Sequence, residues 1–126
     1  MKMTFKKEER VKSRKLIDQI FAEGKTIKEF PFVLKYLTCE LSNESNVQMG
    51  VSVPKKHVPK AVHRNKLKRQ IREIYRKNKG GLQELFKDKD QGLALFLIYT
   101  GGEKEKFNFL EEKLGLILSE LEKRNK

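Results

Sequence analysis

The stretch that decides the fold is residues 47–79, VQMGVSVPKKHVPKAVHRNKLKRQIREIYRKNK. Near its start, Val47, Met49, Val51 and Val53 alternate with small or polar residues, which is the two-residue period of a strand with one buried face. The remainder has the longer apolar period of a helix. This stretch therefore predicts a strand, a short lysine-containing turn and a long helix.

The long helix is predicted to run from Pro59 to about residue 78, because proline suits the first turn of a helix, and we expect Gly80-Gly81 to end it. At about 100° per residue, its apolar residues fall within one sector that can pack on a sheet, namely Leu67, Ile71, Ile74 and Tyr75. The opposite side has a sector of about 60° that contains Asn65, Arg69, Arg72 and Arg76. The sequence thus predicts an exposed stripe of guanidinium groups.

Two further strands are predicted outside this stretch. Residues 30–41, FPFVLKYLTCEL, are β-branched and aromatic, and Pro31 can lie only near the strand start or on an edge. A polar turn at residues 42–46 follows, so we expect direct antiparallel pairing with the strand at residues 47–53. Residues 93–99, LALFLIY, are continuously apolar, which predicts a central strand buried on both faces.

Two more helices are predicted toward the ends of the chain. Ser13 is a suitable N-cap and Gly24 a suitable C′ residue for the first. The closing helix is predicted from apolar residues at intervals of three and four, namely Phe107, Leu110, Leu114, Ile117, Leu118 and Leu121. A long helix between two strands implies a crossover connection onto one sheet. We therefore predict a single two-layer α+β domain over residues 1–126, with residues 1–12 as a flexible basic arm and residues 122–126 as a frayed tail.

Positive charge is concentrated in two segments of the chain. The net charge is +12. Residues 55–79 contain eleven Lys and Arg against the single acid Glu73, a net +10, and residues 1–15 add seven bases against two acids. Glu73 is expected to pair with Lys77 and Arg69 along the helix. A polyanionic partner accounts for such clustering, since neutralised phosphates release counterions, and a solvated basic surface is the alternative.

The composition also excludes several classes of protein. Cys39 is the only cysteine, which excludes an internal disulfide and fits a reducing compartment, and we expect it to be packed in a strand. The N-terminal residues have no apolar signal core, and no window resembles a membrane span, so we expect a cytoplasmic protein with no membrane partner.

No residues form a recognisable catalytic constellation. His57 and His63 lack cysteines or paired carboxylates at metal-ligand spacing. A calcium loop starting at Asp88 would need glutamate where Tyr99 stands. We expect no catalytic residue, no metal site and no small-molecule substrate in this chain.

A family resemblance identifies the polyanion. The segment VSVPKK at residues 51–56, followed by KAVHRNKLKRQIRE at residues 60–73, resembles the signature of the bacterial ribonuclease P protein family. In that family, a strand and a Lys-Lys turn lead into a helix with an Arg-Asn-Arg core. Lys66 replaces the second arginine of that core, which keeps the charge but loses the planar two-donor fork.

The resemblance implies a fold and a function. The fold is a two-layer αββ(β)αβα sandwich with a left-handed crossover helix, like the second domain of ribosomal protein S5. The implied function is that of a non-catalytic protein subunit of ribonuclease P, which promotes endonucleolytic removal of the 5′ leader of precursor tRNA. Catalysis would belong to the RNA subunit and to Mg²⁺ bound mainly by RNA and substrate. The protein is expected to be monomeric within a 1:1 ribonucleoprotein.

The resemblance also implies two RNA-binding surfaces. The surface for the catalytic RNA would contain Lys55, Lys56, Arg64, Asn65, Lys66, Lys68, Arg69, Arg72 and Arg76. A cleft between the long helix, the first helix and the sheet would hold the single-stranded leader, lined by Ile17, Phe21, Val33, Lys35 and Ser52. Phe21 would pack against an unpaired nucleotide, while Lys35 would meet its phosphate.

Two other classes of protein share the composition. A structural ribosomal protein is also small, basic and without catalytic residues, but would not discriminate precursor from mature tRNA. A DNA-binding protein could place the basic helix in a major groove, but would usually need a dimer surface, and none is apparent. Titration against duplex DNA and structured RNA would separate these classes.

Overall fold

A computed structural model describes residues 13–41 and 46–126 of the chain. In this part of the chain, one four-stranded sheet consists of β1 (Lys25–Glu29), β2 (Phe32–Cys39), β3 (Val47–Ser52) and β4 (Gly92–Tyr99). The helices are α1 (Arg14–Glu23), α2 (Ala61–Asn78), α3 (Gly80–Phe86) and α4 (Phe107–Arg124). The predicted basic arm at residues 1–12 lies outside the described residues.

The sheet has the strand order β1-β2-β4-β3. β4 pairs antiparallel with β2 and parallel with β3, so the prediction that β2 and β3 pair directly is wrong. β4 is almost entirely buried, which confirms its predicted central position. β4 lies between β2 and β3 for a physical reason. Its side chains are apolar on both faces, and they are buried most completely when the strand has a neighbour on each side and helices cover both faces of the sheet.

β1 was not predicted from the sequence pattern, and the family architecture only allowed an optional further strand without assigning residues to it. Its sequence, KTIKE, has a single apolar residue, Ile27, which is buried while its neighbours are not. It pairs antiparallel with β2 and forms one edge of the sheet. A strand with a single apolar residue has almost no apolar periodicity and a low intrinsic tendency to form. Its pairing with β2 therefore contributes more to its stability than its own sequence does.

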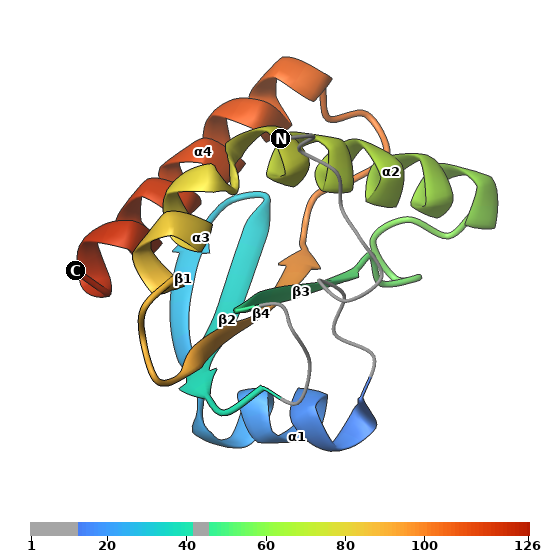
Figure 1. Ribbon diagram of the computed structural model, residues 1–126. Helices are drawn as coiled ribbons and strands as arrows, with labels where there is room; N and C mark the ends of the chain where they lie inside the picture. Colours follow the sequence, from blue (N-terminus) through green and yellow to red (C-terminus); the bar gives the residue numbers. More distant parts are fainter. Residues whose placement is uncertain (1–12, 42–45) are drawn as a thin grey trace.

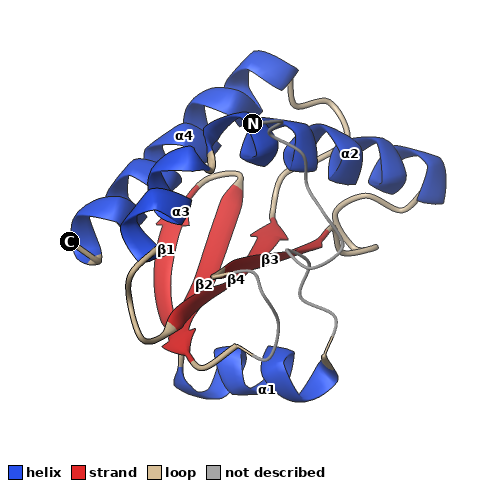
Figure 2. Ribbon diagram, viewed as in Figure 1, coloured by secondary structure: helices blue, strands red, loops and turns tan. Residues whose placement is uncertain are grey.

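Helices cover both faces of the sheet (Figures 1 and 2). On one face, α2, α3 and α4 enclose the main core, which includes Phe32, Leu34 and Tyr36 of β2. On the other face, α1 packs through Ile20 against Cys39 and Ala94. The α+β class is confirmed, and α1 adds a covering to the sheet face that a strict two-layer arrangement would leave open. Cys39 is a packed residue, and burial raises the pKa of its thiol.

The helix ends agree with the predictions at some positions and differ at others. Ser13 accepts a hydrogen bond from the Leu16 N–H at 3.2 Å and caps α1 as predicted. Gly24 has a φ of −74°, so glycine is not needed there for a left-handed backbone conformation. The close approach of β2 explains the glycine instead, because a Cβ would lie only 2.8 Å from the Tyr36 carbonyl oxygen. The Gly80-Gly81 pair follows the end of α2 but begins α3 rather than a loop.

The C-terminal residues differ from the predicted frayed tail. α4 continues through Arg124, whose Nη1 donates to the Thr26 carbonyl oxygen and to the Tyr36 hydroxyl, both at 3.3 Å. Lys89 also donates to the Asn125 carbonyl oxygen at 2.7 Å. These bonds to other elements stabilise the last turn, which the sequence alone did not reveal.

Candidate nucleic-acid interface

α2 has the two chemically different sides that its sequence predicted. Leu67, Ile71, Ile74 and Tyr75 are buried against the main core. The predicted stripe on the other side is accessible: Asn65 and Arg69 are exposed, while Arg72 and Arg76 are partly exposed. Helical periodicity therefore orients the guanidinium groups away from the sheet.

Arg76 is held in an intrahelical pair. Its Nε lies 3.0 Å and its Nη2 2.6 Å from the two carboxylate oxygens of Glu73, whereas Lys77 is 3.9 Å away from the same group. The pairing with Lys77 was predicted, but Arg76 is the nearer partner. The hydrogen bond from Arg76 is the largest cause that lowers the pKa of the Glu73 carboxyl. The pair offers RNA much less net charge than an isolated arginine would.

Arg64 forms hydrogen bonds with the backbone that precedes the N-terminus of α2. Its Nη1 donates to the carbonyl oxygens of Val58 at 3.1 Å and Pro59 at 2.6 Å. The preceding turn is closed by the N–H groups of His57 and Val58, which both donate to the Pro54 carbonyl oxygen at 3.1 Å. This turn leaves Lys55 and Lys56 exposed beside the start of α2.

The basic residues of α2 do not share one face. Arg64 and Lys66 are two positions apart and so project about 160° from one another around the helix. Lys68 lies between Arg64 and the stripe, whereas Lys66 lies on the other side of the stripe, toward Gln70. A straight strand of RNA cannot contact all of these residues at once, so the nine predicted contacts divide among the stripe, its two flanks and the turn with Lys55 and Lys56.

A second surface lies on the sheet face that α1 covers. Residues paired directly across neighbouring strands point to the same side of a sheet. The register brings together Thr26, Lys35, Phe96 and Gly50 in one row, and Lys28, Val33, Ile98 and Ser52 in the next. The predicted residues Val33, Lys35 and Ser52 therefore share one face.

Side chains of α1 complete this surface. The Phe21 ring meets the Phe96 ring edge to face, with centroids 5.4 Å apart, and 45% of Phe21 remains exposed. Ile17 is partly buried on the same side. The Lys35 ammonium group donates to the Thr26 hydroxyl at 2.8 Å, which fixes the cation beside the aromatic pair. The result is a half-covered apolar surface with a positioned positive charge.

The structure adds residues that sequence reasoning missed. Phe96 and Ile98 belong to this surface, but the apolar run of β4 gives no sign of which residues face α1. Only the pairing with Lys35 and Val33 reveals it. The predicted contribution of α2 to this cleft stays a prediction: the apolar side of α2 packs on the opposite face of the sheet (Figure 1).

The described residues contain no group of three or more His, Cys, Asp or Glu side chains able to hold a metal ion. Among the same residues, no helix combines the length and apolarity that a membrane crossing requires.

Comparison with known proteins gives one consistent family. The model of the family described as Ribonuclease P matches residues 5–122. The ribonuclease P protein component of Chlorobium phaeobacteroides is 34% identical over an alignment 128 positions long. The alignment covers 91% of this chain and 86% of the relative. The RNase P protein structure from Thermotoga maritima has a TM-score of 0.70 at 31% identity, covering 89% of this chain and 96% of that one. The Staphylococcus aureus RNase P protein, at 23% identity and a TM-score of 0.71, shares the fold.

Proposed function

The chain belongs to the bacterial ribonuclease P protein family, and from this premise we propose that its two surfaces bind two different RNAs. Membership makes it a protein subunit of ribonuclease P, with a part in tRNA processing and with ribonuclease P RNA as its partner. The α2 surface binds that RNA. The sheet face beside α1 holds the single-stranded 5′ leader of precursor tRNA.

The observation that carries this proposal is the separation of the two surfaces by the sheet. α2 buries its apolar side on one face, while Phe21, Phe96 and Lys35 lie on the other. A basic helix suits the phosphates of a folded RNA, because Arg and Lys contacts release counterions. An aromatic surface with one fixed cation suits an unpaired strand, whose bases stack and whose phosphates are attracted.

The chemistry of cleavage belongs to the RNA subunit and its bound Mg²⁺ in this proposal. The protein contributes binding: one copy joins one RNA, covers phosphates and holds the leader, so precursor binds more tightly and less Mg²⁺ is needed for screening. Lys66 in place of arginine makes its contact a point charge rather than a two-donor fork.

The test is cleavage of 5′-labelled precursor tRNA at low Mg²⁺ by the cognate RNA, with and without this protein and an Arg69→Ala/Arg72→Ala variant. We expect the wild-type protein to restore cleavage at the mature 5′ end and the double variant to be impaired. A protein that changes neither precursor affinity nor the Mg²⁺ requirement would exclude the proposal.

A further inference from the structure

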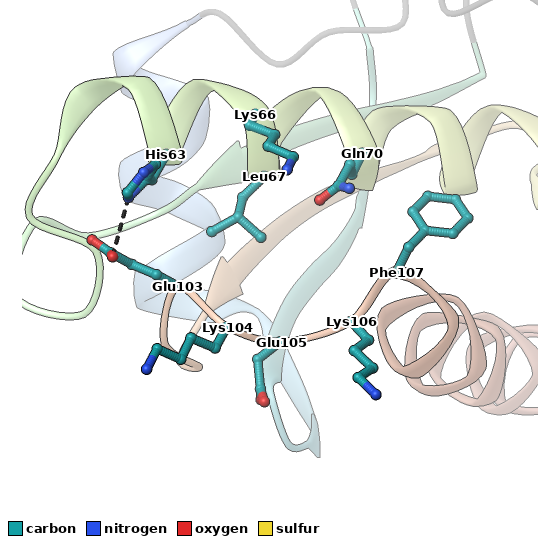
Figure 3. Close-up of a pocket in the computed structure, with 9 residues that line it drawn as sticks. All are labelled: His63, Lys66, Leu67, Gln70, Glu103, Lys104, Glu105, Lys106 and Phe107. Atoms are coloured by element: carbon teal, nitrogen blue, oxygen red, sulfur yellow. Dashed lines mark ion pairs between the residues drawn. The ribbon is translucent and has the colours of Figure 1, made fainter.

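A pocket lies between α2 and the segment that connects β4 to α4 (Figure 3). Its volume is about 530 Å³, and it is lined by His63, Lys66, Leu67, Gln70, Glu103, Lys104, Glu105, Lys106 and Phe107. It is distinct from the α1 surface, because α2 and α1 pack on opposite faces of the sheet. The volume is within the range of small-ligand sites, roughly 300–1,000 Å³.

Specific contacts fix the wall of this pocket opposite α2. The Thr100 N–H donates to the Pro31 carbonyl oxygen at 2.7 Å, and the Tyr99 hydroxyl donates to the Gly102 carbonyl oxygen at 2.6 Å. Gly101 is buried between them, and a Cβ there would lie 2.8 Å from the Pro31 Cβ. The connecting segment therefore leaves the sheet along one defined path.

A contact between Glu103 and His63 closes one end of the pocket. The Glu103 Oε2 lies 3.1 Å from the His63 Nδ1, which joins the connecting segment to the first turn of α2. Figure 3 shows this pair at one end and Phe107 at the other. Between these two ends, the side chains of α2 form the floor.

The interior combines three kinds of contact. Leu67 is 4% exposed and gives an apolar floor, and the partly buried Phe107 ring adds an aromatic face on the α2 side of α4. Gln70 is partly buried and brings an amide that can both donate and accept. Lys66 brings an exposed ammonium group. Lys104, Glu105 and Lys106 point away from α2 in Figure 3 and form the outer rim.

These contacts match the parts of one nucleotide. An aromatic and aliphatic surface suits a base of any sequence, an amide suits the hydrogen-bonding edge of that base, and a lysine suits its phosphate. A free phosphate would use basic side chains such as Lys66 and would leave the apolar floor unfilled. We propose that this pocket binds one unpaired nucleotide of the RNA that lies along α2, with its base on Phe107 and Leu67, its edge at Gln70 and its phosphate at Lys66.

The choice of RNA as the source of the nucleotide rests on the proposed function, since Lys66 lies on the same helix as Arg69 and Arg72. The chemistry of the pocket itself does not depend on that choice. The first experiment therefore uses the free protein. Backbone and side-chain resonances are followed by NMR during titration with AMP, UMP, adenosine and inorganic phosphate.

We expect both nucleotides to shift the Leu67 methyl groups, the Gln70 side-chain amide and the Phe107 amide. Adenosine should produce weaker shifts at the same groups, and inorganic phosphate should affect only basic side chains such as Lys66. A Gln70→Ala or Phe107→Leu change should weaken nucleotide binding about fivefold or more, as loss of a base contact does. Gln83→Ala, on α3 outside the pocket, is the matched control. Equal shifts with phosphate alone, or no shift at these groups, would overturn the proposal.

The second experiment tests the RNA as the source. Base-reactive probes are applied to ribonuclease P RNA bound by wild type, by Gln70→Ala and by Gln83→Ala. We expect one unpaired nucleotide, protected by wild type and by Gln83→Ala, to become reactive with Gln70→Ala while the rest of the footprint stays. Identical protection by all three proteins would exclude an RNA nucleotide in the pocket. Loss of the whole footprint with Arg69→Ala/Arg72→Ala reports separately on the α2 surface, so the two proposals can fail independently.

Discussion

Lys35 and Phe96 lie directly opposite each other on the neighbouring strands β2 and β4. The ammonium group of Lys35 is held at 2.8 Å by the Thr26 hydroxyl of β1, while the Phe96 ring is held by Phe21 of α1. Three consecutive elements, α1, β1 and β2, together with the distant strand β4, therefore place a cation and an aromatic pair on one surface. This arrangement determines what the surface can recognise: a backbone charge and an unpaired base at the same time.

Replacing Lys35 with methionine should weaken precursor tRNA binding to the assembled ribonucleoprotein by about three- to tenfold, because one phosphate contact is lost while the side-chain bulk is kept. Binding of mature tRNA, which has no leader, should not change. The measurement is the affinity of both tRNAs over a salt series, in which the precursor slope should fall by about 1. Lys123→Met, on the exposed end of α4, is the control. Equal weakening for mature tRNA would contradict a leader contact.

Replacing Thr26 with valine should have a smaller effect of the same kind. The substitution keeps the shape of the side chain but removes the acceptor that positions the Lys35 ammonium group. We expect precursor affinity to fall by about two- to threefold, because the ammonium group keeps its charge and loses only the hydroxyl that positions it. In the Lys35→Met background, the same change should have no further effect. A full additional loss in that background would show that Thr26 does not act through Lys35.

The arginines of α2 should not contribute equally to RNA affinity. Arg69 is exposed, whereas Arg76 is bound to the Glu73 carboxylate. Arg69→Ala should therefore weaken binding of ribonuclease P RNA more than Arg76→Ala does. Glu73→Gln should strengthen binding, because it removes a negative charge beside the stripe. The measurement is RNA affinity at several salt concentrations. A larger loss from Arg76→Ala than from Arg69→Ala would show that the Glu73 pair opens when RNA binds.

Arg64 should affect stability as well as RNA binding. Its guanidinium group donates to two carbonyl oxygens at the entry to α2, so Arg64→Ala should lower the free energy of unfolding by about 1–2 kcal/mol. Arg64→Lys keeps the charge but cannot reproduce both bonds with the same planar geometry. Urea unfolding and RNA affinity should be measured for both variants. An unchanged midpoint for Arg64→Ala would mean that the two bonds do not stabilise the folded state.

Tyr99 should make the fold sensitive to alkaline pH. Burial, and to a lesser extent the negative charge of Glu105, raise the pKa of the Tyr99 hydroxyl above its ordinary value near 10. The folded state thus holds this proton more tightly than the unfolded state, so the stabilisation is complete below about pH 10 and is lost as pH rises through the folded pKa.

The Tyr99→Phe variant tests this assignment. Loss of the bond to the Gly102 carbonyl oxygen should cost about 1 kcal/mol at neutral pH. The variant should also lose less stability than wild type between pH 9 and pH 11. Urea unfolding across that range is the measurement. Parallel stability curves for the two proteins would contradict a raised pKa for this group.

Much of the molecule followed from local sequence pattern. The apolar and basic sides of α2, the cap at Ser13, the central position of β4 and the closing helix were all predicted and confirmed. These features depend on the periods of 3.6 and 2 residues and on composition, which are properties of a short stretch of chain. The polyanionic partner was likewise suggested by charge clustering within one helix.

The tertiary structure alone decided which strands are neighbours and which residues of β4 face α1. Strand pairing is a choice among distant segments, and a continuously apolar strand shows no alternation from which its two faces could be told apart. The partners of Arg64 and Arg76 were also invisible, because a helical pattern gives the direction of a side chain but not the carbonyl or carboxylate that it finds. The sequence by itself determined the elements and the charge of α2, while long-range pairing assembled the surface of Phe21, Lys35 and Phe96 and the pocket beside Lys66.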